Sequence, residues 1–271
     1  MPEEREVETP SGVLVVHVWR PAGAATYTVL LAHGYAEHAR RYDHVAERLS
    51  ATGAVVVAPD QRGHGLSAGE RGLMADLDAY AVDLDAVLTS LCDELGGLPL
   101  VLVGHSMGGL IAARFAQRWA ADLTALVLSG PVLGGNPAVF ALADSEVIPD
   151  DPVDPDVLSR DPAVGLAFVA DPLVYHGPYR RETIEAYRAA VNRLREEGPL
   201  GDQPTLWMHG SDDALAPLDL TAEAFERVRG VNSEVIVYPE ARHEIFNETN
   251  RERVLDDLVS FVVRSTRPDE Q

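Results

Sequence analysis

Short runs of aliphatic residues alternate along the chain with longer segments whose apolar residues recur every three or four positions. The runs have the length and the β-branched content of strands, and the later segments between them have the period of amphipathic helices. This alternation predicts an α/β fold, a mostly parallel central sheet flanked by helices. The predicted strands cover residues 13–18, 28–32, 54–58, 98–103, 123–128, 205–208 and 234–238.

The N-terminal segment predicts an antiparallel start to this sheet. Thr9-Pro10-Ser11-Gly12 joins residues 6–8 to the first aliphatic run, and its composition is typical of a tight hairpin turn. The clearest helix is expected over residues 77–95, with Asp76 as its N-cap. The single cysteine, Cys92, falls on the apolar stripe of that helix, so a position in the core is predicted.

One connection is too long for a simple crossover between parallel strands, which needs about a dozen residues. With residues 6–8 counted as the first strand, it separates the sixth strand, near residue 128, from the seventh, near residue 205. The sequence therefore predicts a core of residues 1–131 and 204–271 and an inserted cap of residues 132–203. The insertion is rich in Asp and Pro at first, carries an amphipathic helix over 182–197, and has enough apolar residues to favour a lid.

The fourth long aliphatic run ends in Gly104-His105-Ser106-Met107-Gly108, where a helical pattern begins at once. A strand that reverses into a helix within so few residues forces a strained backbone at the serine and needs glycines beside it. This geometry lifts a serine hydroxyl above the carboxyl edge of the sheet. We predict that Ser106 is a nucleophile rather than part of an ordinary turn.

A serine hydroxyl needs an imidazole to remove its proton and a carboxylate to orient that imidazole. On this fold the partners follow in the order Ser, Asp or Glu, His, each after a later strand. Of the nine histidines, His243 follows the last strand and is the predicted base. Asp213 is the predicted acid, with Asp212 beside it as the alternative.

Acyl transfer also needs donors for the developing oxyanion. We expect the backbone N–H of Met107, which follows the nucleophile, and the backbone N–H of Tyr35 in the His33-Gly34-Tyr35 loop after an early strand. The glycine-rich segment 60–67 has the composition of a structural loop that braces the site.

Charge limits the partners of the chain. The formal net charge is −21 and all basic residues are arginine, so nucleic acid, anionic membranes and polyanionic substrates are disfavoured. No cofactor or metal is expected, because Asp150, Asp151, Asp154 and Asp156 lack the glycine and glutamate of a calcium-binding EF-hand loop. The N-terminus has no signal-peptide pattern and no apolar run approaches about 18 residues, so a soluble, cytoplasmic protein is expected.

Four segments together resemble the monoacylglycerol lipase family of α/β-hydrolases. They are the H-G-x-x-E-H-x-x-R-Y pattern of residues 33–42, G-H-G-x-S at 63–67, G-H-S-M-G at 104–108 and R-H-E-x-x-N-E at 242–248, and Asp171-Pro172-Leu173-Val174 in the cap also fits. The resemblance implies an α/β-hydrolase fold and hydrolysis of one acyl chain from a neutral glycerol monoester.

The resemblance also implies where such a substrate binds. The head group lies near Glu37, Arg41 and His105, although Glu37 and Arg41 could instead form a structural ion pair. The acyl chain lies in an apolar tunnel beneath the cap, for which the candidates are Phe140, Leu142, Leu166, Phe168, Leu173 and Val174. At position 168 the family usually has a tyrosine that helps to hold the glycerol, and Phe168 lacks that hydroxyl.

Several functions remain open at this point. The leading interpretation is a serine carboxylester hydrolase that acts on monoacylglycerols. A lysophospholipase, an esterase for small neutral esters and a ligand-binding receptor on a hydrolase scaffold are the alternatives. The apolar cap is suited to transient contact with a lipid surface, and a homodimer is the alternative use of that surface.

Overall fold

Within residues 1–150 and 153–267, which the computed structural model describes, eight strands form one sheet. They are β1 Glu3–Thr9, β2 Gly12–Trp19, β3 Tyr27–Ala32, β4 Ala54–Pro59, β5 Leu100–His105, β6 Ala125–Ser129, β7 Thr205–Gly210 and β8 Ser233–Tyr238. Their order across the sheet is β1-β2-β4-β3-β5-β6-β7-β8. All pairs from β4 to β8 are parallel, whereas β1 with β2 and β2 with β4 are antiparallel. The predicted sheet and its N-terminal hairpin are thus confirmed.

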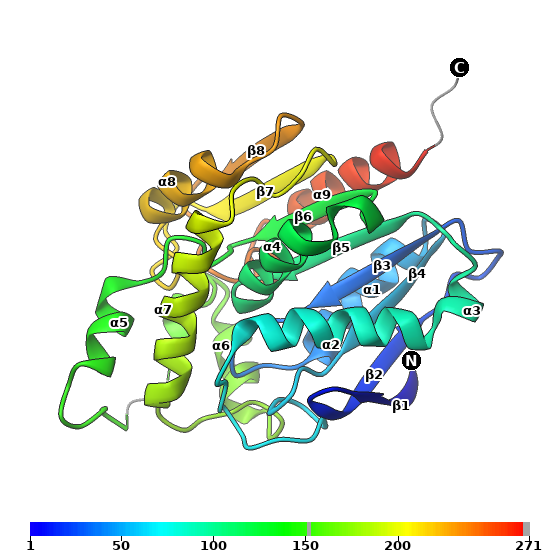
Figure 1. Ribbon diagram of the computed structural model, residues 1–271. Helices are drawn as coiled ribbons and strands as arrows, with labels where there is room; N and C mark the ends of the chain where they lie inside the picture. Colours follow the sequence, from blue (N-terminus) through cyan, green and yellow to red (C-terminus); the bar gives the residue numbers. More distant parts are fainter. Residues whose placement is uncertain (151–152, 268–271) are drawn as a thin grey trace.

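Helices cover both faces of the sheet (Figure 1). They are α1 Asp43–Ser50, α2 Leu77–Ser90, α3 Cys92–Leu95, α4 Met107–Trp119, α5 Pro137–Ala143, α6 Pro162–Ala170, α7 Arg181–Glu196, α8 Leu218–Val228 and α9 Arg251–Thr266. Short 3₁₀ turns occupy Ala39–Tyr42, Ala120–Asp122, Pro155–Val157 and Ile245–Asn247. One apolar core lies between the sheet and helices α2, α4, α7 and α8, and a second lies between the sheet and α1 and α9.

This burial on both faces explains why the central strands appear in the sequence as continuous aliphatic runs. Every residue of β3, β4 and β6 is buried, so neither face of these strands needs polar side chains. The edge strand β8 differs, because all five of its residues before Tyr238 are exposed or half-buried. The most apolar strands therefore lie at the centre of the sheet, where the site is built.

The predicted helix over 77–95 begins and ends as expected but is broken at Leu91 into α2 and α3. Asp76 accepts a hydrogen bond from the N–H of Asp78, which caps α2. The helix stops at Ser90, and Leu91 leaves the helical conformation at φ −108° and ψ 6°. This break turns Leu91 into the core and places Cys92 on the surface. The prediction of a core cysteine was therefore wrong.

The connection from β6 to β7 carries α5, α6 and α7, and we call residues 132–203 the inserted segment. It is held to the rest of the molecule at the loop that follows β3. The N–H of Tyr175 donates to the carbonyl oxygen of Ala36 at 2.7 Å, and His38 Nε2 lies 2.8 Å from an oxygen of Asp171. Asp151 lies outside the described residues. In residues 1–150 and 153–267, no helix has both the length and the apolar character needed to cross a membrane.

Candidate active site

Ser106 lies in the turn between β5 and α4, in a backbone conformation that residues with a side chain rarely adopt. Its φ is 54° and its ψ is −116°. A Cβ on Gly104 would lie 2.2 Å from the carbonyl oxygen of Gly108, and a Cβ on Gly108 would lie 2.1 Å from that of Ala32. The two glycines thus permit the close approach of strand and helix that holds the serine in this strained turn.

Two further side chains complete a hydrogen-bonded series with Ser106. His243, from the loop after β8, places Nε2 at 2.8 Å from Ser106 Oγ. Its Nδ1 lies 2.8 Å from Asp213 Oδ2. The other oxygen of Asp213 accepts hydrogen bonds from the N–H groups of Leu215 and Ala216, at 2.9 and 2.8 Å. With Nδ1 donating to Asp213, the lone pair of His243 Nε2 faces the serine hydroxyl.

Asp212, the alternative acid, faces away from this series. Its side chain is exposed and accepts a hydrogen bond from Ser211 Oγ at 2.8 Å. Asp213 is buried beside His243. The structure therefore brings Ser106, His243 and Asp213 together and leaves Asp212 as a turn residue.

The electrostatic environment distinguishes His243 from the histidines around it. Burial lowers the pKa of His105 well below its ordinary value, and burial also lowers the pKa of His209. Burial acts on His243 in the same direction, but the charge of Asp213 and its hydrogen bond outweigh that effect and raise the pKa of His243. Burial opposes ionisation of Asp213, yet His243 and the surrounding donors hold its pKa below the usual value. An ionised Asp213 thus supports a basic imidazole at His243.

The loop after β3 lies directly against the serine. A Cβ on Gly34 would lie 3.2 Å from Ser106 Cβ, so a larger residue would crowd the site. Gln61 donates its backbone N–H to His33 Nε2 at 2.8 Å and its side-chain amide to the carbonyl oxygen of His33 at 2.6 Å. Asp60 accepts from the N–H of Ala39 at 2.8 Å. Segment 60–67 therefore braces this loop, as its composition indicated.

The two predicted oxyanion donors belong to segments that lie against Ser106. Met107 is the first residue of α4, so its N–H has no carbonyl partner within that helix. Tyr35 directly follows Gly34, the residue that approaches Ser106. Their assignment as oxyanion donors stays a prediction that this placement favours.

Glu37 and Arg41 belong to a buried network of ion pairs. Arg41 donates to Glu37 at 2.9 Å and, through both terminal nitrogens, to Glu244 at 2.7 and 2.9 Å. Glu37 also accepts from the N–H of Gly34 at 2.6 Å and from the hydroxyl of Tyr42 at 2.5 Å. The structural ion pair considered from the sequence is therefore present. Glu244 is a member that the sequence did not indicate, because its partner lies in a loop 203 residues away.

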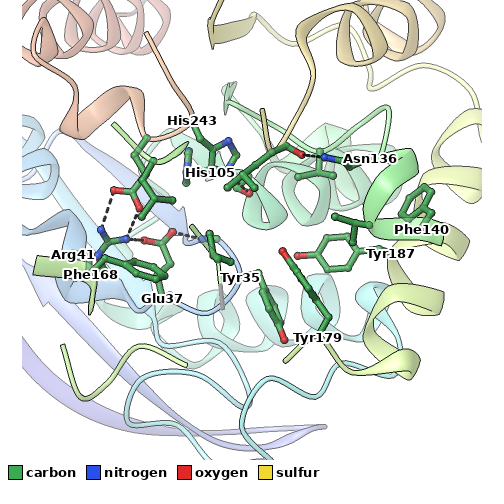
Figure 2. A pocket seen from close by; sticks show the side chains of 18 residues that line it. Tyr35, Glu37, Arg41, His105, Asn136, Phe140, Phe168, Tyr179, Tyr187 and His243 are labelled. Carbon is green, nitrogen blue, oxygen red and sulfur yellow. Dashed lines mark hydrogen bonds and ion pairs between the residues drawn. The ribbon is translucent and has the colours of Figure 1, made fainter. Parts of the chain in front are cut away.

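A cavity of about 700 Å³, measured with its open mouth, connects these groups. Figure 2 shows Glu37, Arg41 and Phe168 on one side of it and Asn136, Phe140, Tyr179 and Tyr187 on the other. His105 and His243 line its inner wall, and Ser106 contributes to the lining. The guanidinium of Arg41 lies over the ring of Phe168, at 5.0 Å from the ring centre. The polar network and the mostly apolar wall thus occupy opposite arms of one pocket.

The predicted apolar pocket is only partly correct. Phe140 and Phe168 line the cavity, whereas Leu142, Leu166, Leu173 and Val174 do not. The helix α6 is apolar on all sides, but only Gly165 and Phe168 are buried. Leu166 is left 72% exposed. Val174 is buried behind the wall, against Phe168 and Ala36. The sequence missed Val132, Val139, Val153, Leu158, Tyr179, Tyr187 and Leu215, which line the cavity.

No group of three or more His, Cys, Asp or Glu side chains is placed to hold a metal ion among the described residues, 1–150 and 153–267. Asp150, Asp154 and Asp156 are exposed.

Known proteins are similar to this chain in both sequence and fold. The family described as serine aminopeptidase, S33, matches residues 23–250. A monoacylglycerol lipase of Mycolicibacterium smegmatis is 37% identical over 262 residues, which cover 93% of this chain and 94% of that one. A human monoglyceride lipase is 29% identical over 87% of this chain and 81% of its own length.

Solved structures agree with these relatives. The structure of a monoacylglycerol lipase from Paleococcus ferrophilus superimposes with a TM-score of 0.81 at 27% identity, covering 93% of this chain and 99% of that one. The family match, over residues 23–250, includes strands β3 to β8, the serine turn and the inserted segment. The chain belongs to the monoacylglycerol lipase family of α/β-hydrolases, within the group described as serine aminopeptidase, S33.

Proposed function

We propose that this protein hydrolyses the ester of monoacylglycerols to a fatty acid and glycerol. The observation that carries the proposal is the continuous series from Asp213 through His243 to Ser106, with 2.8 Å at each contact, at the wall of a pocket with one polar and one apolar arm. Membership of the monoacylglycerol lipase family supports the same substrate class.

The reaction follows from the geometry of these groups. Ser106 Oγ attacks the ester carbonyl while His243 Nε2 takes the hydroxyl proton, and the carbonyl oxygen becomes an oxyanion near the N–H groups of Met107 and Tyr35. The imidazolium then gives its proton to the departing alcohol oxygen as the C–O bond breaks. Water, deprotonated by His243, attacks the acyl-enzyme, and the acid leaves as Ser106 regains its proton. Asp213 stabilises the imidazolium in both halves.

The charge of the polar arm supports a neutral head group. Two carboxylates, of Glu37 and Glu244, surround the one guanidinium of Arg41, which is engaged by both. An anionic phosphate would meet more negative than positive charge there, so a lysophospholipid is a weaker candidate. A diol can donate hydrogen bonds to the carboxylates of Glu37 and Glu244, which line the cavity together with His105.

A small neutral ester is the second candidate, and Phe168 favours it. Phe168 stands in the pocket wall next to Arg41 without the hydroxyl that the family usually offers to glycerol. The receptor alternative is disfavoured, because binding alone does not need an aspartate, a histidine and a serine in hydrogen-bond contact.

A substrate panel on the wild type and on Ser106→Ala tests the proposal. Monoacylglycerols of increasing chain length, a diacylglycerol, a lysophospholipid and p-nitrophenyl esters are compared at equal concentration. We expect turnover of monoacylglycerols and a loss of about 10⁶-fold in kcat for the substitution. Turnover of short activated esters alone would retain the serine chemistry but reject the glycerol lipid as substrate.

We also propose that residues 132–203 act as a cap that touches lipid surfaces. Val147, Leu166 and Val169 of this segment are 75%, 72% and 56% exposed, which supports transient contact with an apolar phase. A homodimer through the same residues is the alternative, and sedimentation with and without vesicles distinguishes the two. The cytoplasmic location expected from the sequence stays a prediction.

A further inference from the structure

Two tyrosine hydroxyls lie in the mostly apolar arm of the pocket. Tyr179 precedes α7 and Tyr187 lies within it, and both line the cavity together with Val132, Val139 and Phe140. In Figure 2 the hydroxyl ends of both rings point into the cavity. Neither the proposed binding of a head group in the polar arm nor the packing there explains why two phenols line the apolar arm.

Packing against Tyr35 holds the two rings in position. The rings of Tyr35 and Tyr179 are stacked, with centres 5.2 Å apart and planes at 12°. The ring of Tyr187 meets Tyr35 edge-on, with centres 6.3 Å apart and planes at 79°. Tyr35 is itself anchored, because its hydroxyl donates to the carbonyl oxygen of Gly72 at 2.9 Å. The direction of the hydroxyls of Tyr179 and Tyr187 is therefore set by aromatic contacts.

These two hydroxyls differ from the other tyrosines near the pocket. The hydroxyls of Tyr35, Tyr42 and Tyr175 donate to Gly72, Glu37 and Pro178. Within residues 1–150 and 153–267, those of Tyr179 and Tyr187 make no hydrogen bond to the protein. Burial raises the pKa of Tyr179 to about 12 and that of Tyr187 well above its ordinary value. Both phenols consequently keep their protons and remain donors.

A donor of this kind discriminates between acyl chains. Water can satisfy a phenol in an empty pocket, but a plain alkyl chain that displaces this water leaves the hydroxyl without a partner. An oxygen on the chain at the same position replaces the lost water. This discrimination concerns the acyl chain alone, because in the proposed function the polar head group binds in the opposite arm.

We propose that Tyr179 and Tyr187 form a polar subsite in the acyl arm, which favours esters whose acyl chain carries a hydroxyl or oxo group over plain alkyl esters of equal length. This inference rests on the proposed serine ester hydrolysis, and it names the class of acyl chain.

The experiment uses p-nitrophenyl esters of one medium chain length, unsubstituted or with a hydroxyl at successive carbons. All share one leaving group, so the series is readable whether or not glycerol is the natural alcohol. We expect one hydroxy isomer to exceed the unsubstituted ester in kcat/KM by about 10-fold in the wild type. In Tyr179→Phe/Tyr187→Phe, which keeps both rings, this ratio should fall to about one or below.

Tyr175→Phe is the matched control, because it removes a hydroxyl that donates to Pro178 and does not line the cavity. In this variant, the ratio of kcat/KM for the hydroxy ester to kcat/KM for the plain ester should equal that of the wild type. If no hydroxy isomer is preferred by the wild type, or if the double variant keeps the preference, the polar subsite is rejected. Failure to hydrolyse any p-nitrophenyl ester would instead reject the proposed serine chemistry.

Discussion

The two walls of the pocket are built in different ways. The wall formed by the core carries Ser106, Asp213 and His243, each at the end of a strand or in the loop that follows it, and each held by hydrogen bonds. The wall formed by the inserted segment carries Phe140, Phe168, Tyr179 and Tyr187, which are positioned by ring contacts.

The two ways of building a wall suit two tasks: the core wall is suited to the chemical reaction, and the inserted wall is suited to selecting the acyl chain. Hydrogen bonds between groups at the ends of strands of one sheet fix atoms to within the tolerance that proton transfer needs. Apolar packing fixes shape and volume, and it tolerates exchange of side chains of similar size. We therefore expect substitutions on the core wall to act on kcat, and those on the inserted wall to act on which acyl chain is accepted.

Asp213→Asn should give the largest effect in this comparison, a loss of about 10⁴-fold in kcat, because an amide does not hold His243 in the required tautomer. The neutral imidazole is the base, so wild-type activity falls as the pH decreases through the raised pKa of His243. The substitution removes the charge that raises this pKa and leaves the burial that lowers it. The acidic limb of the kcat/KM profile should therefore move to lower pH.

Asp212→Asn provides the matched control, since this aspartate is adjacent but exposed. Its kcat and its pH profile should be those of the wild type to within about 2-fold. An equal loss in both variants would show that the loop, and not the carboxylate of Asp213, determines the rate.

Arg41→Met should have the next largest effect, on stability. It leaves the carboxylates of Glu37 and Glu244 buried, at 5% side-chain exposure each, without the guanidinium between them. Breaking a buried ion pair in this way costs about 3–5 kcal/mol in the free energy of unfolding. Urea denaturation of the wild type and the variant measures the difference.

Arg48→Met is the control for a surface pair. Arg48 is 41% exposed and faces Glu252 and Asp256, which are more exposed still. Its loss should change the free energy of unfolding by about 1 kcal/mol or less. If both variants lose the same amount, the network around Arg41 has no special part in holding the loop after β3.

The placement of the core wall could be predicted from the sequence because it follows from local patterns. Gly104 and Gly108 flank Ser106 at the end of an aliphatic run, and a parallel sheet brings the ends of its strands to one edge. The position of His243 after the last strand then left few alternatives. Contacts between distant loops have no such local signal, so the bond from Arg41 to Glu244 was not predicted.

The inserted wall could be predicted only as a region. In α6, Leu166 and Phe168 are two apolar residues in a helix that is apolar all round, and the period of the sequence does not distinguish the face that packs. Tyr187 lies within the amphipathic helix predicted over 182–197, but an apolar stripe indicates burial and not which side chain reaches a cavity. The prediction for Cys92 was wrong for a related reason. The helix breaks at Leu91, and Cys92 lies on the surface instead of in the core.

Ile184→Ala tests how firmly the inserted segment is packed. Ile184 lies in α7 with no exposed surface. Its truncation leaves a cavity and should lower the free energy of unfolding by about 2–5 kcal/mol, as measured by urea denaturation. A change below about 1 kcal/mol would indicate that α7 detaches before the core unfolds and contributes little to global stability.

Leu166→Ser should give the smallest effect, and it sharpens the distinction between packed and exposed apolar residues of the inserted segment. Leu166 is 72% exposed and does not line the cavity, so the free energy of unfolding should change by no more than about 0.5 kcal/mol. If this surface meets lipid, the rate toward a monoacylglycerol in neutral vesicles should fall relative to the rate toward a dissolved ester. Val231→Ser, on a residue that is 86% exposed outside the segment, is the control and should leave that ratio unchanged. Equal ratios in wild type and both variants would reject contact with lipid through Leu166.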